Sequence, residues 1–440
     1  MRDQIAASDT IFALSSGSLP SGVGVIRISG PQSVDVLTRL TGSVPKPRRA
    51  TLAALYDLDH NLIDRGICLF FQGPGSFTGE DCAELQVHGG KAVIAKLLET
   101  LASIPEMRGA EAGEFTRRAY INGKLDLANA EALSDLISAE TEAQRRFAIA
   151  NSDSRHRQLY DDWRRQLIEA RALIEAELDF SDESDVPGSV SDMVWEQVRG
   201  LQQQVVSHAA SYRDAEIIRD GLKVVILGAP NAGKSSLLNA IAKRDVAIVT
   251  DEAGTTRDVL EVHLDLDGLK VTLADTAGIR EATGNVEAIG IKRSLERAQS
   301  ADLILHVEDM EDPVSFDGMP PAPVIKIGNK ADLTNGSTHD KYDCIISTKR
   351  SEGLDQLIAL LKVHGAQYLE KSTSVIPFRE RHKVLLEEAS AHIAQALYQD
   401  ELELAAENLR LASDSLGRIC GRIDVEDLLD TIFSTFCIGK

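Results

Sequence analysis

The chain carries the octapeptide Gly228-Ala229-Pro230-Asn231-Ala232-Gly233-Lys234-Ser235 between an apolar run at 223–227 and a helix-forming segment at 236–241. A strand, a glycine-rich loop and a helix in this order form a phosphate-binding loop. Backbone N–H groups of such a loop surround the phosphates, Lys234 reaches the β- and γ-oxygens, and Ser235 ligates magnesium. A single match could be chance or belong to an ATPase, so the segments that follow decide its meaning.

Two further loops bear on the phosphates. Asp275-Thr276-Ala277-Gly278 closes a predicted strand at 269–274. Its carboxylate would hold magnesium through water, and the Gly278 amide would sense the γ-phosphate. Between these motifs lies Gly254-Thr255-Thr256-Arg257-Asp258, a glycine-hinged loop with hydroxyl groups. We expect Thr256 to be the magnesium ligand of a mobile switch.

The base-reading motifs come next. Asn329-Lys330-Ala331-Asp332 closes a predicted strand at 324–328. The carboxylate of Asp332 can accept hydrogen bonds from both the ring N–H and the exocyclic amine of guanine. Adenine lacks that pair, so such a site rejects ATP by roughly 10⁴ or more. Ser347-Thr348-Lys349 follows the apolar run 344–346 and is expected beside the base. Thr348 stands where many related loops have alanine, a departure that leaves the backbone contact possible.

The order of these motifs predicts a GTP-binding domain. Each motif alone could be an ordinary turn, because Gly, Asn and Asp are common turn residues. Four in order are different, since each follows a predicted strand at the end where doubly wound sheets bind ligands.

The position after the second motif is unusual. Many GTPases carry there a glutamine that orients the attacking water, but this chain has Ile279, which has no hydrogen-bonding group. Another residue must position the water, or the domain hydrolyses GTP very slowly alone. Glu281 and Glu287 follow nearby. Judged by residue type alone, each is better interpreted as a solvent-exposed glutamate on a helix than as a catalytic residue.

Composition bounds the class and the compartment. The chain has 440 residues, which is enough for about two to four domains. Its residues are 43% apolar and 26% charged, a composition typical of globular proteins. It has no apolar run of membrane-spanning length, no evident signal peptide and five scattered cysteines without metal spacing. We therefore expect a cytoplasmic protein with reduced thiols. The net charge of −21 argues against a broad nucleic-acid footprint, so any such role needs a local patch or a more basic partner.

Periodicity divides the chain further. Residues 1–118 mix predicted strands near 22–30, 67–71 and 84–87 with a helix at 91–102, an α+β pattern. Residues 125–214 are helical, with an acidic break at 181–188 that reads as a solvated loop. Helical spacing returns after about 372–377. Some sixty helical residues make a poor core alone, so they should pack on the 125–214 helices and make the GTP domain an insertion.

Three further groups of residues carry a family resemblance. The N-terminal region contains Ile26-Arg27-Ile28-Ser29-Gly30, and Phe77-Thr78-Gly79-Glu80-Asp81 followed by Glu84-Leu85-Gln86-Val87-His88-Gly89-Gly90. The helical region opens with Gly113-Glu114-Phe115-Thr116-Arg117-Arg118-Ala119 and Asn122-Gly123-Lys124-Leu125-Asp126-Leu127, and the sequence ends in Phe436-Cys437-Ile438-Gly439-Lys440. Over essentially its whole length the chain resembles the tRNA uridine modification GTPases of the MnmE (TrmE) family.

The resemblance implies a multidomain fold and a set of partners. An α+β N-terminal domain that binds tetrahydrofolate and dimerises would span 1–119. An all-α domain would span 120–216 and 376–440, with an inserted α/β P-loop G domain, Ras-like, at 217–375. The family forms homodimers that join the flavin-dependent MnmG (GidA) in a heterotetramer or larger assembly. With a 5-formyl- or methylene-type folate as one-carbon source, it modifies the 5-position of the wobble uridine of certain tRNAs. The tRNA is bound mainly through the partner, and no membrane is involved.

The resemblance also implies site residues. Folate would contact Arg27, Glu84, Lys124 and Lys440. G domains of the family pair across their nucleotides and bind potassium where other GTPases use an arginine finger. Asn231, Thr250, Glu252 and Thr255 would be the potassium ligands, Ser235 and Thr256 would hold magnesium, and Glu287 would position the water. The GTP site would comprise Asn231, Ala232, Gly233, Lys234, Ser235, Ser236, Thr250, Asp251, Glu252, Ala253, Gly254, Thr255, Thr256, Asp275, Thr276, Ala277, Gly278, Asn329, Lys330, Asp332, Ser347, Thr348 and Lys349.

Two functional hypotheses remain at this point. In the first, GTP-driven pairing of the inserted domains reshapes the helical core and permits tRNA modification. In the second, the chain is a regulatory or ribosome-assembly GTPase whose outer domains only recruit partners. The G domain serves both equally, and the C-terminal motif with the folate-matching charges favours the first. Cys437 stays outside the catalytic set. A lone cysteine is more often a small buried apolar residue than a reactive group, and the position beside Lys440 only makes the two interpretations equal.

Overall fold

The structure of the protein is a computed structural model that describes residues 9–179, 190–244, 246–247, 261–275, 299–313, 321–334, 339–421, 429, 432–434 and 436–439. The chain forms two compact units. The first contains residues 1–134, 157–164 and 413–440, and the second contains residues 135–156 and 165–412.

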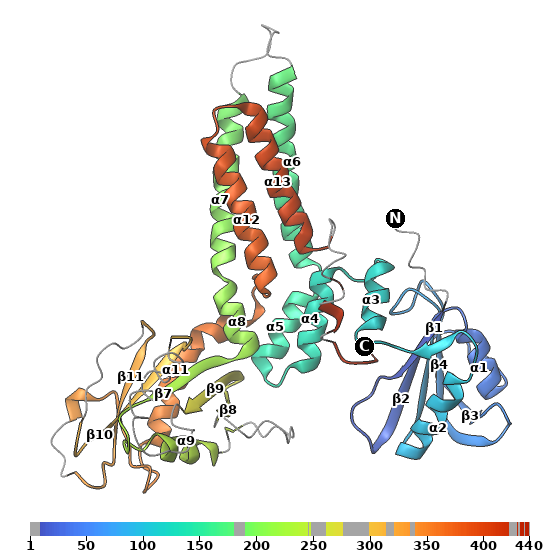
Figure 1. Ribbon diagram of the computed structural model, residues 1–440, viewed down its shortest axis with the longest axis horizontal. Coiled ribbons are helices and arrows are strands. Elements are labelled where there is room, and N and C mark those ends of the chain that lie inside the picture. Colours follow the sequence, from blue (N-terminus) through green and yellow to red (C-terminus); the bar gives the residue numbers. More distant parts are fainter. Residues whose placement is uncertain are drawn as a thin grey trace, which may run out of the picture. The chain divides into compact units, whose positions relative to one another are not determined.

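A six-stranded sheet forms the centre of the first unit (Figure 1). Its strand order is β3-β4-β5-β2-β1-β6, antiparallel except for the parallel pair β1 and β6. The elements are β1 (Thr10–Leu14), β2 (Ser21–Ser29), α1 (Ser33–Thr41), β3 (Thr51–Tyr56), β4 (Leu62–Phe71), β5 (Cys82–Gly89), α2 (Lys91–Ala102), β6 (Met107–Gly109) and α3 (Glu114–Ile121). The strands predicted at 22–30, 67–71 and 84–87 and the helix at 91–102 are confirmed.

The two faces of this sheet are used differently. Because side chains alternate along a strand, Ile26 and Ile28 of β2 point to one face, where they pack with apolar residues of α1 and α2. Arg27 points to the other face, where its guanidinium lies 5.8 Å from the ring centre of Phe115 in α3. One face is therefore an apolar core, and the other carries charged groups.

The last described residues of the chain belong to this first unit. Ala112 and Ile438 form an antiparallel bridge, and Ser15 Oγ donates to the Gly439 carbonyl at 2.8 Å. Gly439 has φ +95°, and a Cβ there would lie 2.3 Å from the Leu14 carbonyl oxygen. Only glycine fits this close approach to β1.

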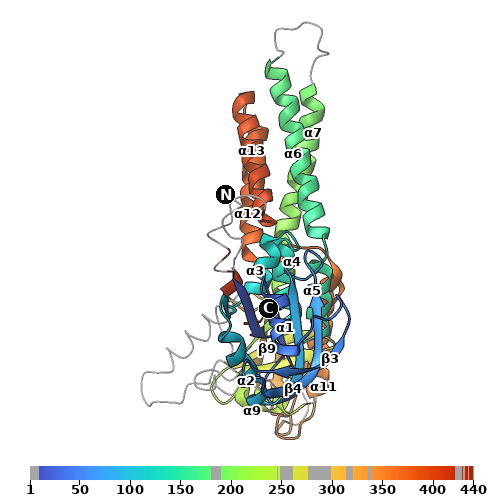
Figure 2. The same ribbon diagram turned by 90° about the vertical axis from the view of Figure 1, so that its right-hand side faces the viewer.

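Helices occupy the predicted helical stretches on both sides of the inserted domain. They are α4 (Leu127–Ser138), α5 (Glu142–Ser152), α6 (Arg155–Asp179), α7 (Val190–Ala210), α8 (Tyr212–Asp220), α12 (Glu380–Tyr398) and α13 (Leu402–Ile419). Within the second unit α12 runs beside α7, as both views show (Figures 1 and 2). The expected packing of the later helical segment on the earlier one is thus confirmed for this pair. No helix among the described residues combines the length and the apolar composition that crossing a membrane requires.

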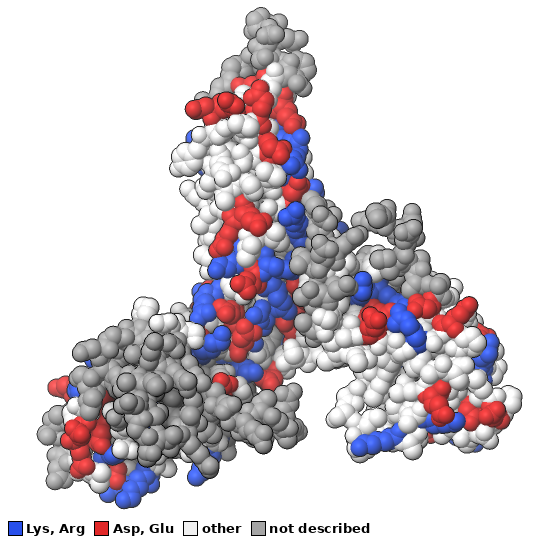
Figure 3. Space-filling model, viewed as in Figure 1, with Lys and Arg blue, Asp and Glu red and all other residues white. Residues whose placement is uncertain are grey.

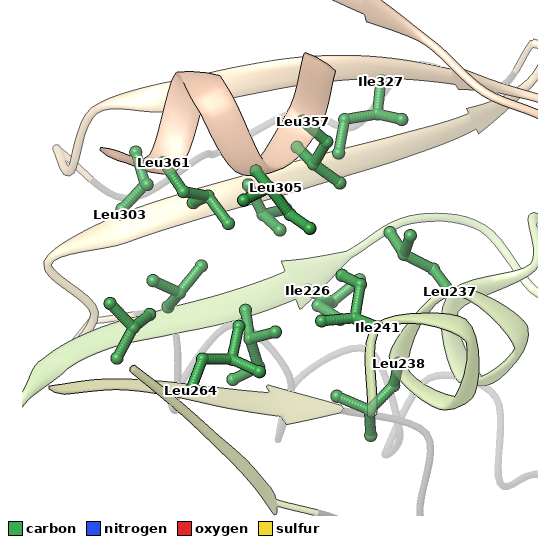
Figure 4. Packing of buried hydrophobic residues seen from close by; sticks show 14 of the residues in the cluster. Ile226, Leu237, Leu238, Ile241, Leu264, Leu303, Leu305, Ile327, Leu357 and Leu361 are labelled. Atoms are coloured by element: carbon green, nitrogen blue, oxygen red, sulfur yellow. The ribbon is translucent and has the colours of Figure 1, made fainter. Parts of the chain in front are cut away.

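The inserted domain is a second six-stranded sheet of order β12-β11-β10-β7-β9-β8, with only β8 antiparallel to its neighbour. Its elements are β7 (Leu222–Leu227), α9 (Lys234–Ala242), β8 (Glu261–Leu266), β9 (Leu269–Asp275), β10 (Leu303–Asp309), β11 (Val324–Asn329), β12 (Cys344–Ile345) and α11 (Leu354–Glu370). The strands predicted at 223–227, 269–274, 324–328 and 344–346 are confirmed, although β12 is shorter than expected. Figure 4 shows leucine and isoleucine side chains of β7, β10 and β11 meeting those of α9 and α11 in one buried cluster.

The β8–β9 turn connects the inserted domain to α5. The Ala143 amide donates to the Gly268 carbonyl at 3.0 Å, and Lys270 pairs with Glu140. Gly268 has φ +95°, so this turn favours glycine, and a Cβ there would lie 3.3 Å from that of Glu142. The inserted domain and α5 therefore meet at a close-packed polar joint.

Candidate functional site

The shape of the phosphate-binding loop depends on glycines that have no room for a side chain and on residues with a left-handed backbone. Gly233 has φ +95° and precedes α9, and Asn231 has φ +65°. A Cβ at Gly228 would lie 2.2 Å from the Val307 carbonyl oxygen, and one at Gly233 would lie 2.2 Å from Asn329 Nδ2. Lys234 Nζ donates to the Gly228 and Ala229 carbonyls at 3.0 and 2.9 Å. The Lys234 side chain thus bends back over the phosphate-binding loop.

Asn329 joins the base-reading turn to the phosphate loop. Its side chain is fully buried, and Nδ2 donates to the Ala232 carbonyl at 2.8 Å. Its Oδ1 accepts from the Thr348 amide at 3.4 Å. The contact to Thr348 is made by the backbone, as expected for a position where alanine is common. One buried amide therefore holds three loops together.

Asp332 is held by Ser347. The Ser347 hydroxyl donates to Asp332 Oδ1 at 2.7 Å and accepts from the Arg350 amide at 3.2 Å. The hydrogen bond from Ser347 is the main cause that lowers the pKa of Asp332 below its ordinary value. The Ala331 amide also donates to the Ile346 carbonyl at 3.1 Å. The carboxylate is thus ionised and fixed, as a reader of guanine N–H groups must be.

The remaining predicted residues of this site divide into two groups. Ser235 and Ser236 lie in the first turn of α9, Asp275 ends β9, and Lys349 follows the Ser347 turn. The second group lies outside the described residues: Thr250, Asp251, Glu252, Ala253, Gly254, Thr255, Thr256, Thr276, Ala277, Gly278 and Glu287.

Asp309 lies beside the base-reading turn, and it was not predicted from the sequence. Its Oδ2 lies 2.6 Å from Lys330 Nζ. Partial burial raises the pKa of Asp309, but the hydrogen bonds from Lys330 and the Glu311 amide outweigh burial, and the net pKa is lowered. A signal was present in the sequence, because two acidic residues follow the mostly apolar run 303–307, on the strand between the phosphate loop and the base-reading turn.

A second group of predicted residues meets on the charged face of the N-terminal sheet. Arg27 of β2 stands directly opposite Glu84 of β5, and its Nη2 and Nε donate to Glu84 Oε1 at 3.1 and 3.2 Å. The Arg27 guanidinium lies 5.4 Å from the Phe77 ring centre. Lys124 Nζ donates to the Pro74 carbonyl at 2.9 Å, so Arg27 and Lys124 both reach the 74–80 loop. Lys440 lies outside the described residues.

A buried ionic network continues along the same sheet face. Arg118 is 5% exposed and pairs with Glu80, Asp9 and Glu114 at 3.2, 2.9 and 3.0 Å. Glu80 Oε2 also accepts from the Ser29 hydroxyl at 2.6 Å. A cavity of 880 Å³ lies beside this network and is lined by Gly30, Pro31, Glu80, Asp81, Arg108, Glu111, Ala112, Glu114, Arg117, Arg118, Ile121, Asn122, Phe433 and Ser434. In the sequence, Arg118, Glu80 and Glu114 stand out only as parts of the motifs at 77–81 and 113–119.

Two family models match the chain. One is described as the MnmE helical domain and matches residues 127–437, and the other is described as the GTP-binding protein TrmE N-terminus and matches residues 10–124.

Curated relatives match along the whole length. A protein of Chelativorans sp. (strain BNC1), named tRNA modification GTPase MnmE, is 60% identical over 442 residues, which is 100% of both chains. One of Mesorhizobium japonicum with the same name is 54% identical over 441 residues, covering 99% of this chain and 100% of its own. Among solved structures, the G domain of the T. maritima FeoB iron transporter is 22% identical, with a TM-score of 0.25, over 35% of this chain and 99% of its own.

Proposed function

This chain belongs to the MnmE family of tRNA modification GTPases, and on that basis we propose that potassium accelerates its GTP hydrolysis and that its N-terminal domain binds a folate one-carbon donor. With a flavin-dependent partner, it modifies the 5-position of the wobble uridine of certain tRNAs. The observation that carries the nucleotide part is the set of proposed guanine-reading residues, in which Ser347 fixes Asp332 and Asn329 links the Thr348 backbone to the phosphate loop.

The residue types that we propose as ligands suit magnesium and potassium. Hydroxyl and amide oxygens are hard ligands suited to magnesium and potassium. Ser235 and Thr256 would hold magnesium, and Asn231, Thr250, Glu252 and Thr255 would hold potassium. A cation beside the β- and γ-phosphates supplies charge neutralisation worth about 10³ to 10⁵ in rate. Asn231 supports this role because its left-handed backbone belongs to the loop that wraps the phosphates.

Glu287 would orient the attacking water in place of the glutamine that Ile279 replaces. Lys234 would move from the loop carbonyls to the phosphates when nucleotide binds, since it already lies beside them. Glu287→Ala should slow hydrolysis and spare nucleotide affinity, and an unchanged rate would reject this role.

The direct test is steady-state GTP hydrolysis in potassium against sodium, with ATP as the specificity control. We expect strong stimulation by potassium with GTP alone. A rate that is the same in both salts would remove the proposed cation site, and hydrolysis of ATP at a similar rate would reject Asp332 as base reader.

Folate binding is supported by the chemistry of the Arg27–Glu84 pair. A pterin ring presents adjacent donors and acceptors that a carboxylate can read, and the glutamate tail of folate requires cations such as Lys124 and Lys440. The two paired side chains are 24% and 20% exposed, so a ligand can reach them. The ring of Phe77 beside Arg27 offers a surface for stacking. Titration with 5-formyltetrahydrofolate tests this, and the absence of binding would reject it.

We propose that the N-terminal domain also forms the homodimer. On β3 and β4 the cross-strand pairs Leu52–Ile67 and Tyr56–Leu62 place exposed apolar side chains on the sheet surface. Leu52 is 76% exposed and Leu62 is 53% exposed. A cluster of this kind marks an interaction surface. Leu52→Glu should shift the molecular mass in solution toward the monomer, and an unchanged mass would exclude this surface.

The charge distribution supports tRNA binding mainly through MnmG, the more basic partner that we propose. On the face shown in Figure 3, basic and acidic side chains lie interspersed over the base of the helical bundle, and acidic ones gather near its end. At a net charge of −21, the chain should bind tRNA weakly on its own. The proposed compartment is the cytoplasm.

We also propose the division into residues 1–119, 120–216 with 376–440, and 217–375. Hydrolysis in the last of these would drive paired G domains apart and move the helical domain through the joint at Gly268 and Ala143. The competing function, a regulatory or ribosome-assembly GTPase, would tolerate loss of the folate residues. It gains support if Arg27→Ala leaves tRNA modification intact.

A further inference from the structure

Two adjacent acidic residues at the end of β10, Glu308 and Asp309, each contact one of the two base-side segments of the nucleotide domain. Asp309 uses both carboxylate oxygens: Oδ2 lies 2.6 Å from Lys330 Nζ, and Oδ1 accepts from the Glu311 amide at 3.0 Å. The second bond fixes the carboxylate, so Lys330 meets an acceptor that is already oriented.

Glu308 makes the corresponding contacts to the other segment. It is 5% exposed, and its Oε2 accepts from Lys341 Nζ and from the Tyr342 hydroxyl, the latter at 3.1 Å. Lys341 and Tyr342 lie shortly before β12 (Cys344–Ile345), which leads into Ser347. His306 Nδ1 lies 3.7 Å from Glu308 Oε1 on the same strand. A buried carboxylate thus anchors the start of the segment that carries the partner of Asp332.

The backbone keeps the two contacts in register. Asp309 is the strand partner of Asn329, and the Met310 amide donates to the Asn329 carbonyl at 3.2 Å. A Cβ at Gly328 would lie 2.9 Å from the Tyr342 ring and 3.0 Å from Met310, so the three segments pack closely there. Lys330 follows with φ +64°, an uncommon conformation for a residue with a side chain. Contacts from the end of β10 and from Tyr342 therefore fix the backbone next to Lys330.

We propose that Asp309 is a positioning residue for guanine nucleotide binding, which holds Lys330 in place beside the base while Glu308 holds the segment of Ser347. A lysine has several rotatable bonds, and fixing it before the ligand arrives lowers the entropy that binding must otherwise remove. Asp309 itself does not touch the nucleotide in this assignment. The inference rests on the proposed role of Asp332 and Lys330 in reading the base.

The test is a double-mutant cycle in the full-length protein with Asp309→Asn, Lys330→Ala and both together. We expect Asp309→Asn to raise KM for GTP and Kd for GDP about three- to tenfold, the effect of one lost charged hydrogen bond at a partly exposed site, with kcat unchanged. In the Lys330→Ala background the same substitution should have no further effect. Asp309→Glu, which keeps the charge, should recover part of the affinity.

The matched control is Asp355→Asn. Asp355 pairs with Arg244 at 2.7 Å in the same domain and is far more exposed than Asp309, so its loss should leave KM unchanged. An Asp309→Asn effect that persists without Lys330, or a KM equal to that of Asp355→Asn, would overturn the proposal. Asp332→Ala separates the two levels. If it leaves the preference for GTP over ATP intact, the proposed base site is wrong, and if it abolishes the preference while Asp309→Asn is silent, only the positioning role is wrong.

Discussion

The nucleotide domain and the N-terminal sheet domain hold their candidate site residues in different ways. In the nucleotide domain, Asn329, Asp332 and Lys234 each form hydrogen bonds with the loops that follow the strands. Their partners are loop carbonyls, backbone amides or a hydroxyl. In the N-terminal domain Arg27 and Glu84 bond to each other across two strands. The first arrangement orients groups before a ligand arrives, whereas the second satisfies two charges that a ligand must then share or separate.

The difference shows what each kind of site requires of a sequence. Loops at strand ends need glycines and short polar residues in a fixed local order, because their backbone must turn sharply around the ligand. A sheet-face site needs only two side chains at paired positions, and those positions lie 57 residues apart here. Binding energy at the second site therefore depends on how well the ligand replaces an existing ion pair.

Lys234→Ala should produce the largest effect and would separate the two regions most clearly. We expect GTP hydrolysis to fall by about 10³ or more, because the cation that reaches the β- and γ-phosphates is lost. Folate affinity should stay the same. The control is Lys243→Ala, an exposed lysine after α9. A Lys234→Ala protein that hydrolyses GTP normally would contradict the proposed phosphate site.

Acid should destabilise the second unit at a higher pH than the first. Burial, together with the nearby His382, lowers the pKa of His208 to about 4, against 6.5 for a free histidine. The folded state then binds fewer protons, so stability is lost as pH falls from 6.5 to 4, up to about 3 kcal/mol. In the first unit, burial raises the pKa values of Asp9 and Glu114, but the hydrogen bonds and charges of their partners, chiefly Arg108 and Arg118, outweigh burial and lower both pKa values. Their contribution is lost only below about pH 4.5.

The two tryptophans report on this difference, since Trp163 belongs to the first unit and Trp195 to the second. Denaturant unfolding followed by fluorescence in Trp163→Phe and Trp195→Phe proteins measures each unit between pH 7 and 4. His208→Gln should flatten the pH dependence of the second unit alone. Equal pH dependence in both units would show that His208 is not the controlling group.

Glu84→Gln should have an intermediate effect, confined to the N-terminal domain. We expect folate affinity to fall roughly 10- to 100-fold, because a charged hydrogen-bond acceptor is lost. Stability should change by less than about 1 kcal/mol, since the Arg27–Glu84 pair is partly exposed. Calorimetric titration with 5-formyltetrahydrofolate measures the first quantity. Asp35→Asn, which removes a surface pair with Arg39, is the control and should leave folate affinity unchanged.

Thr348→Ala should have the smallest effect and sharpen the comparison from the other side. The backbone amide of Thr348, and not its side chain, donates to Asn329. We expect KM for GTP to change by less than about twofold, since alanine keeps that amide. A change of tenfold in steady-state hydrolysis would show that the side chain itself contributes.

Sequence patterns predicted β7, β9, β11 and β12 of the nucleotide domain, because each of these strands leads into a motif whose residues are adjacent in the chain. They did not predict β8 or β10, which carry no such motif. They did not predict the contact between Asp309 and Lys330, which depends on β10 and β11 lying side by side in register. The pairing of Arg27 with Glu84 was likewise beyond local patterns. Family resemblance named both residues, but only strand register shows that they are opposite each other.

The bridge between Ala112 and Ile438 has a consequence for how the protein is made. The N-terminal sheet leaves the ribosome early, yet residues 413–440 of its own unit are synthesised only after the intervening residues 165–412 of the second unit. At about 5–20 residues per second, the sheet waits on the order of tens of seconds for that segment. The Gly439 contact with Leu14 and Ser15 then forms only after residue 439 has left the ribosome. A nascent chain that stops early leaves this unit open, and the quality-control machinery of the cell can recognise it.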